Sequence, residues 1–415
     1  MRAGCAGLML AFSVATAATA VPRGSLFAQP VDPSPPGGAA VPEALVRVPA
    51  DADNDPWAIL TPEPAYFRFE AVNLAFTHFV QRGRGFQSRA GPASGPGLED
   101  TSIEQPQAEL IARQGKHLTH RIWVPIDIVT AASPDAVDIV STASKTNEAG
   151  SFDWTVGYAD VAFDGAFRVG FHSEENFHSW NVGLGVDIPF AEENTILSAS
   201  FNDVFDWFDD YRLDGSHSGH VTRNALNGNV GVTQLLSPST IAHAEVGSTV
   251  QSGDLSNGWN IVPLSDGTVV QETLPKERFR NAFVLRMAQY LPFEAALRGS
   301  YRFYADDWGL FAHSGEFELQ KRLAAFSRLR LSYRVHDQTS VSFFTTRGSP
   351  LDDGEKTADS DLASFGSHTV GFAGIFDFEV PFAKSLHLDF GIDRYLRTND
   401  LQATLFALGA GLLFL

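Results

Sequence analysis

The stretch Trp180-Asn181-Val182-Gly183-Leu184-Gly185-Val186-Asp187-Ile188 alternates between large apolar residues and residues that are polar or small. Successive side chains on a β-strand point to opposite faces, so this stretch has one apolar face and one polar or small face. The pattern therefore predicts an all-β protein. It returns in about sixteen segments, which start near Tyr66, Gln107, Leu118, Phe152, Phe167, Phe177, Ile196, Arg223, Thr240, Phe279, Ala296, Phe311, Arg328, Phe365, Leu386 and Leu401.

The composition of the two faces decides between two architectures. Soluble sandwiches and propellers place the apolar face inside, whereas a membrane barrel places it outside. Lys is rare, the second face is rich in Gly, Ala, Asn, Asp and Arg, and the chain contains 33 Phe. These faces are typical of a lipid-facing wall around a crowded or watery lumen. We predict a single transmembrane antiparallel up-and-down β-barrel of about 16 strands, or 14 if the first pair does not span. Pro125 makes the third strand the least secure.

The lengths of the links between segments give an independent test. Links after even-numbered segments are short, as in Gln114-Gly115-Lys116 and Leu236-Ser237-Pro238-Ser239. Short turns at one end and long loops at the other are typical of outer-membrane barrels, and an even strand count places both termini in the periplasm. Most links after odd-numbered segments are indeed long, at residues 81–105, 131–150, 207–222, 252–278 and 337–363.

The amino-terminal region carries an export signal. Residues 1–20 have a basic Arg2, an apolar stretch and a small-residue end, which predicts a signal peptide cleaved after Ala20, with cleavage after Ala28 as the alternative. Residues 21–64 form a Pro/Gly/Ala-rich tract that we interpret as a periplasmic leader. Residues 65–415 are the predicted outer-membrane β-barrel.

The carboxyl end and the composition indicate partners. The last strand carries Phe406, Phe414 and Leu415 and resembles the strand that the barrel-assembly machinery recognises, although that strand usually ends in an aromatic residue. We expect contact with outer-membrane lipid and lipopolysaccharide in the cell outer membrane. With 49 acidic against 30 basic residues the formal charge is −19, which argues against binding to nucleic acid. The single cysteine, Cys5, leaves no disulfide and no thiolate metal site, and we predict no cofactor.

Three motifs occur in order along the chain. They are Val129-Thr130-Ala131-Ala132-Ser133-Pro134-Asp135-Ala136, Val232-Thr233-Gln234-Leu235-Leu236-Ser237-Pro238-Ser239-Thr240, and Tyr301-Arg302-Phe303-Tyr304-Ala305-Asp306-Asp307-Trp308-Gly309 followed by His313. Together they resemble a family of uncharacterised Gram-negative outer-membrane β-barrel proteins that carries a domain-of-unknown-function label. The resemblance runs over most of residues 118–415. It implies an outer-membrane barrel, supplies no catalytic residues, and hints at a periplasmic lipoprotein or redox partner.

Charged residues follow the polar face of four consecutive segments in the second half of the chain. Acids on one strand should pair with bases on its neighbours across the sheet. One interpretation is a charge ladder that neutralises itself and stiffens the inner wall, and the other is a basic wall that attracts anionic solutes. Seven arginines against two glutamates keep the second interpretation open. The predicted lumen residues are Arg280, Arg286, Arg298, Arg302, Arg328, Arg330 and Arg334, with the acids Glu316 and Glu318.

The link after the seventh segment contains carboxylates and two imidazoles, which are ligand types for a divalent ion. Their spacing matches no defined metal site, so a specific loop ion site and a solvated acidic loop both stay open. The candidates are Asp206, Asp209, Asp210, Asp214, His217 and His220. A second acidic pair, Asp306 and Asp307 beside Trp308, indicates a hairpin turn with an interfacial tryptophan.

The sequence favours transport over catalysis. Asp210 with His217, or His172 or His368 with nearby serines, could be combined into a hydrolase site, but no spacing singles out a nucleophile with its base. We therefore expect no enzyme, and an outer-membrane hydrolase is the least favoured interpretation. A barrel of about sixteen strands is wide enough for an aqueous channel, so the leading interpretation is a porin-like passive channel for small polar or anionic solutes. The alternative is a non-conducting barrel scaffold that anchors a periplasmic or redox partner.

Overall fold

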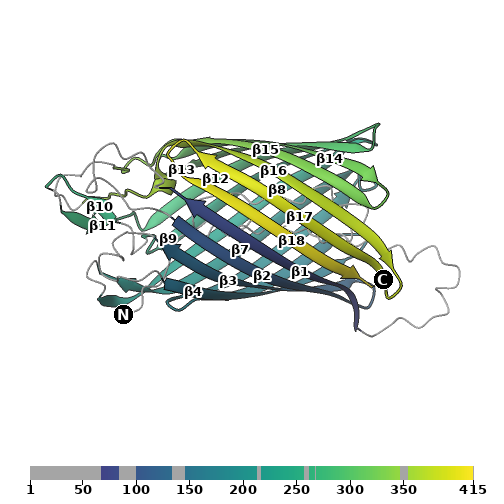
Figure 1. The fold of residues 1–415 in the computed structure, drawn as a ribbon, viewed down its shortest axis with the longest axis horizontal. Coiled ribbons are helices and arrows are strands. Elements are labelled where there is room, and N and C mark those ends of the chain that lie inside the picture. Colours follow the sequence, from purple (N-terminus) through teal and green to yellow (C-terminus); the bar gives the residue numbers. More distant parts are fainter. Residues whose placement is uncertain are drawn as a thin grey trace.

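Sixteen strands close into one antiparallel barrel. The computed structural model describes residues 67–83, 100–132, 145–212, 216–256, 261–266, 268–345 and 354–414. Around the barrel the strands follow the order β1-β18-β17-β16-β15-β14-β13-β12-β9-β8-β7-β6-β5-β4-β3-β2 (Figure 1). The predicted fold class and the count of 16 are confirmed, and the alternative of 14 is wrong. The predicted signal peptide and leader lie outside the described residues. In the described part of the chain, no helix has the length and apolar character needed to cross a membrane.

The barrel strands range from 10 residues in β5 to 21 residues in β8. They are β1 (Phe67–Arg82), β2 (Asp100–Gln114), β3 (Leu118–Ala132), β4 (Lys145–Ala159), β5 (Asp164–Ser173), β6 (Phe177–Phe190), β7 (Thr195–Tyr211), β8 (His217–Ser237), β9 (Thr240–Gly253), β12 (Glu277–Leu291), β13 (Ala295–Asp306), β14 (Phe311–Ala324), β15 (Ser327–Gln338), β16 (Phe365–Val380), β17 (Ala383–Arg397) and β18 (Gln402–Leu413). A separate hairpin pairs β10 (Ile261–Pro263) with β11 (Val269–Gln271), and a short 3-10 helix η1 covers Ser360–Leu362.

The apolar face of the strands points outward. Val230, Phe317 and Leu408 are 66 %, 62 % and 58 % exposed, and similar residues repeat around the barrel. Large apolar residues of soluble proteins are usually buried, and contiguous apolar surface marks contact with an apolar partner or a membrane. Within the described residues, these outward-facing rows of Phe and Leu do not meet in a central core. The outer wall is therefore of the kind that contacts acyl chains.

The inner face is crowded by polar and small residues. On β6, Trp180 and Leu184 are exposed, whereas Gly183 between them is buried. A Cβ atom added at Gly170 of the neighbouring strand would overlap the side chains of Asn181 and Asp153. Glycine at such positions lets the polar side chains of adjacent strands approach across the wall, which accounts for part of the high glycine content.

β3 passes through Pro125 without a change of register. Pro125 lies opposite Gln107 of β2, and the pairing with β4 continues from Trp123 to Ile126 in one register. Proline lacks a backbone N–H, so it interrupts the hydrogen-bond ladder but not the direction of the strand. The third predicted strand is confirmed.

The two ends of the barrel differ as expected. Turns such as 115–117, 238–239 and 325–326 are short, while β10, β11 and η1 belong to longer links at the opposite end (Figure 1). One predicted long link, 207–222, is wrong, because β7 continues to Tyr211 and β8 begins at His217. Strand pairing there extends through polar residues, which the apolar alternation does not mark.

Candidate channel lumen and its loop constriction

Two of the predicted lumen arginines share one carboxylate. Arg298 of β13 donates to Oε1 of Glu318 at 2.7 Å, and Nε of Arg330 on β15 lies 4.0 Å from Oε2 of the same residue. The register explains the first contact, since Arg298 lies directly opposite Glu318. Glu318 therefore bridges the strands on either side of β14.

Other arginines form ion pairs with acidic residues on the strands next to β12–β15. Arg286 lies 3.7 Å from Glu245 of β9, and Arg328 donates to Asp377 of β16 at 2.5 Å. These acids are in reach because β12 pairs with β9 and β15 pairs with β16. The inner wall is thus a network of cross-strand pairs that extends beyond the two glutamates considered from the sequence.

The remaining predicted lumen residues lie within the same wall. Arg280 donates from Nε to the Tyr304 hydroxyl at 2.8 Å. Glu316 lies opposite Arg334 in the register of β14 and β15, and Arg302 lies opposite Ser314. The structure therefore brings all the predicted arginines and glutamates to one sector, β12 to β15.

The sequence analysis did not predict a buried ion pair that lies at the loop end of this sector. Arg278 donates from Nε and Nη2 to Oδ2 of Asp306 at 2.9 and 2.5 Å, and its guanidinium lies 4.2 Å from the ring centroid of Trp308. Arg278 precedes Arg280 by two residues and so lies on the same face of the strand. This spacing could have predicted from the sequence that Arg278 belongs to the inner wall. Trp308 is only 5 % exposed, so the prediction of an interfacial tryptophan is wrong.

The link between β15 and β16 folds against the inner face of the barrel mouth. Asp361 of η1 accepts a hydrogen bond at 2.5 Å from Nη2 of Arg397, which lies on the inward-facing row of β17. Gln338 of β15 donates to the carbonyl oxygens of Asp361 and Ala363 at 2.8 and 2.7 Å. Side chains of the inward-facing rows therefore hold this link against the wall at the barrel mouth.

An apolar cluster supports the same link. Leu310 and Val341 are almost completely buried, and both pack with residues of the inward-facing row on β13 and β14. The complete cluster consists of Tyr304, Trp308, Leu310, Ala312, Val341 and Leu362, with Leu255, Leu274, Phe343 and Phe344 at its edge. Burial of this kind contributes roughly 1.5–3 kcal/mol for each large side chain, so the link is packed and not merely tethered.

The link between β9 and β12 joins the β15–β16 link. Thr273 and Lys356 exchange two backbone hydrogen bonds of 2.9 Å, and the hydroxyl of Thr357 donates to Glu272 at 2.8 Å. In the β10–β11 turn, the hydroxyl and backbone N–H of Thr268 donate to Asp266, which lowers the pKa of that carboxyl. We call the described parts of the two links, residues 254–276 and 339–364, the mouth loops.

A hydroxyl–imidazole–carboxylate relay lies on the inner wall elsewhere. The hydroxyl of Ser151 lies 2.7 Å from Nδ1 of His172, and Nε2 of His172 lies 3.1 Å from Glu174. The sequence had offered His172 with an unspecified serine. The arrangement recurs at Thr233–His243–Glu245 and, with an amide, at Ser314–His336–Gln338. It follows from strand register, because the hydroxyl faces the imidazole across the ladder and the third group is two residues along. His368 instead lies 2.8 Å from the Tyr333 hydroxyl, not from a serine.

The candidates for a loop ion site separate into two groups. Asp206 pairs with Arg223 at 2.7 Å, and Asp210 accepts from the Ser218 hydroxyl. Both lie on the inward-facing row of β7, away from Asp209, whereas Asp209, His217 and His220 come together. Asp214 lies outside the described residues.

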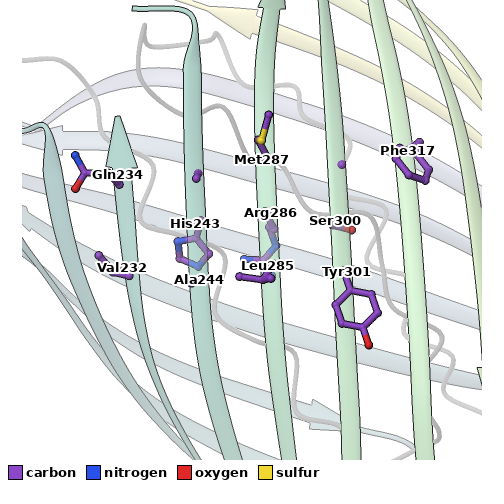
Figure 2. Close-up of a pocket in the computed structure, with 12 residues that line it drawn as sticks. Val232, Gln234, His243, Ala244, Leu285, Arg286, Met287, Ser300, Tyr301 and Phe317 are labelled. Carbon is purple, nitrogen blue, oxygen red and sulfur yellow. The ribbon is translucent and has the colours of Figure 1, made fainter. Parts of the chain in front are cut away.

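The outer wall carries a shallow apolar groove over β8, β9, β12, β13 and β14 (Figure 2). Its volume is ≈ 550 Å³. Its lining includes the large side chains of Leu285, Met287, Tyr301 and Phe317 and the small residues Ala242, Ala244 and Gly299. A groove of this composition suits an acyl chain.

The closed sixteen-strand barrel, with its apolar exterior and polar interior, has the architecture of the outer-membrane β-barrels. Within this class, the chain belongs to the family described as "Protein of unknown function (DUF3570)", whose model matches residues 126–410. The family resemblance inferred from the three motifs is confirmed.

The comparison with solved structures returns outer-membrane proteins that are distant from this chain in sequence. A bacterial polysaccharide outer membrane secretin is 9 % identical with a TM-score of 0.46, covering 83 % of this chain and 98 % of its own. A BenF-like porin from Pseudomonas fluorescens Pf-5 is 8 % identical with a TM-score of 0.43, covering 83 % and 99 %. A Pseudomonas aeruginosa FadL homologue is 10 % identical with a TM-score of 0.43, covering 84 % and 90 %. The comparison with curated proteins found no match.

Proposed function

We propose that the protein is a passive channel of the cell outer membrane for small polar or anionic solutes, narrowed at one mouth by its own loops. The observation that carries the proposal is the closed barrel of sixteen strands whose inner wall is charged and hydrogen-bonded. Barrels of about this size leave an aqueous channel, whereas about eight strands leave an interior filled by side chains.

The mouth loops supply the selectivity element in this proposal. Asp361 and Arg397 fix the loop next to the inner wall, and solutes entering from that end pass the charges of the β12–β15 sector. Ordered charges beside a narrow opening raise the local concentration of counter-ions and so shape selectivity. A solute therefore needs to be small and hydrated, and an anion meets the guanidinium groups of this sector.

Planar bilayer recording tests the proposal directly. The full-length protein should give defined conductance steps, and replacing the sector's arginines by serine should lower the preference for anions in a salt gradient. A silent membrane, from protein whose heat-sensitive mobility on a gel shows a folded barrel, contradicts a channel. Unchanged reversal potentials contradict the anion preference. The arginines to replace are Arg298, Arg302, Arg328, Arg330 and Arg334.

A second candidate is a non-conducting scaffold that holds a periplasmic lipoprotein or redox partner. The packed mouth loops favour it, since Leu310 and Val341 are 1 % and 2 % exposed within a cluster at the opening. Removing the contact of Asp361 with Arg397 distinguishes the candidates. A channel should conduct in the wild type and conduct more when the loop is released, whereas the scaffold should be silent in the wild type.

We propose no hydrolytic activity, although a relay of Ser151, His172 and Glu174 exists. Its recurrence with threonine and with glutamine favours a structural role in the wall. A fluorophosphonate probe that labels serine nucleophiles should leave the protein unmodified. Labelling that disappears in Ser151→Ala would assign an acyl-transfer site instead.

A further inference from the structure

We propose that Asp209, His217 and His220 form a binding site for a divalent transition-metal ion such as Zn²⁺. The three side chains belong to the β7–β8 hairpin, where Asp209 lies opposite His220 and His217 lies opposite Tyr211. One ligand atom from each residue lies within 4.8 Å of the other two. In the described part of the chain this is the one group of His, Cys, Asp and Glu side chains gathered so closely. The site is separate from the lumen and does not depend on the proposed channel.

A β-bulge brings the two histidines to one face. On a regular strand, residues three apart point to opposite faces. The register of the hairpin shifts between Asp210 and Tyr211, and Gly219, with φ of 147°, lies at this irregularity. A bulge inserts one extra residue and reverses the alternation beyond it. His217 and His220 consequently join Asp209, and their rings lie 5.1 Å apart in an edge-to-face arrangement.

The distances are close to those of a coordination sphere. Oδ1 of Asp209 lies 3.5 Å from Nε2 of His217 and 2.6 Å from Nδ1 of His220. A tetrahedral zinc ion with bonds of about 2.0–2.2 Å separates neighbouring ligand atoms by about 3.3 Å. The first distance already fits. The second becomes suitable when the ion replaces the proton between His220 and Asp209, which requires a movement of less than about 1 Å.

The other oxygen of Asp209 has its own partner. The hydroxyl of Tyr211 donates to Oδ2 of Asp209 at 3.4 Å, and its ring contacts His217 edge-on at 5.5 Å between centroids. A hydrogen bond to the second oxygen orients a metal-ligating carboxylate and tunes its basicity. Tyr211 therefore leaves Oδ1 directed to the histidines.

Exposure and ligand chemistry define the class of ion. The side chains of His217 and His220 are 44 % and 76 % exposed, so an ion reaches them from solvent and retains open positions for water. Two imidazoles and one carboxylate favour Zn²⁺, Ni²⁺ or Cu²⁺, whereas Mg²⁺ and Ca²⁺ prefer oxygen ligands. Asp206 and Asp210, which could have supplied those oxygens, bind Arg223 and Ser218 instead.

Calorimetric titration with ZnCl₂ tests the site. Full-length protein in detergent, without a histidine tag, should bind one ion per chain with micromolar affinity. Asp209→Asn, His217→Gln and His220→Gln should each weaken that affinity by about tenfold or more. The matched control is His368→Gln, which changes an exposed histidine bonded to Tyr333 and should leave affinity unchanged.

A second measurement reports the ligands themselves. CoCl₂ bound by two imidazoles and a carboxylate should give a visible absorption band, which His220→Gln should abolish while heat-modifiable gel mobility still shows a folded barrel. MgCl₂ and CaCl₂ should not displace the cobalt. The proposal is overturned if the wild-type protein takes up no zinc at millimolar concentration, if the three variants bind like the wild type, or if Mg²⁺ competes equally.

Discussion

Replacing Asp361 by Asn should release the β15–β16 link from the barrel mouth. The substitution keeps the shape of the side chain and leaves the backbone carbonyl of residue 361 in place for Gln338. It removes the negative charge that lies 2.5 Å from Nη2 of Arg397. The change therefore acts on one ion pair and leaves the packing of η1 otherwise intact.

The magnitude follows from the burial of both partners. The side chains of Arg397 and Asp361 are 4 % and 7 % exposed, so loss of the carboxylate leaves a buried guanidinium without its counter-charge. Breaking a buried pair in this way costs about 3–5 kcal/mol. In the variant, Arg397 still donates to the Tyr395 hydroxyl at 2.6 Å and still lies 4.0 Å from the centroid of the Phe365 ring. These remaining contacts favour a cost at the lower end of this range. Since 1.4 kcal/mol corresponds to a tenfold change, about 3 kcal/mol raises the released population roughly 100-fold.

Limited proteolysis measures that population. Lys356 is 5 % exposed and its backbone is paired with Thr273, so trypsin cleaves after it only when the mouth loops separate. When separation is fast, the cleavage rate follows the open population. Trypsin should therefore cleave the Asp361→Asn variant after Lys356 about 100-fold faster than it cleaves the wild type. Arg394→Gln is the control, because Arg394 is exposed on the outward face of the same strand and bonds Thr404 at 2.6 Å.

A double-mutant cycle that combines Asp361→Asn with Arg397→Gln tests whether loss of this ion pair causes the release of the link. In the double variant, the loss of free energy that holds the mouth loops closed should be smaller than the sum of the losses in the two single variants. The reason is that neither buried charge then remains without a partner. Cleavage of Asp361→Asn within about threefold of the wild type, which is under 1 kcal/mol, would refute the argument. Strict additivity of the two substitutions would refute it equally.

Three further predictions concern the wall. Glu318→Gln removes the carboxylate at 2.7 Å from Arg298, so the reversal potential of the proposed channel should move towards that of chloride; no movement contradicts a role for this pair in selectivity. Phe317→Arg places a charge on a side chain that is 62 % exposed on the outer wall and should cost about 2–4 kcal/mol in urea unfolding from lipid vesicles, with Phe317→Leu as the milder control. Gly253 has φ of 110°, and a Cβ there would overlap the carbonyl oxygen of Thr222. Gly253→Ala should therefore lower the free energy of unfolding by about 1–3 kcal/mol. If the folded gel band is lost at the same temperature as in the wild type, this prediction is contradicted.

The alternation of apolar residues predicted the barrel because one physical constraint acts on every spanning strand. Each strand exposes one face to an apolar surrounding, so period two persists even through Pro125, where only the ladder is interrupted. The constraint ends where the apolar zone ends. For that reason the extension of β7 to Tyr211 and the bulge between His217 and Gly219 leave no periodic signal, and the link at 207–222 was predicted to be a loop.

The partners of the lumen charges depend on register, which local pattern does not determine. Glu318 and Arg298 were expected on the same face of neighbouring segments, without a specific pairing, and the structure pairs them. The partners of Arg286 and Arg328 are Glu245 and Asp377, on strands that were not considered together with the basic segments. Choosing among acids on adjacent strands requires knowledge of which residues are opposite, and a shift by two residues preserves the face while changing every pair.

The motif at 301–309 helps to hold the mouth loops in place. Asp306 accepts hydrogen bonds from Arg278, the Tyr304 hydroxyl and the backbone N–H of Leu310. The indole N–H of Trp308 donates to a backbone carbonyl at 2.9 Å, and its ring contacts Phe343 of the β15–β16 link edge-on. The motif therefore forms a rigid corner against which a distant link packs. Its residue types were visible in the sequence, but its burial was not, because the covering link lies about 35 residues further along the chain and no local period connects the two.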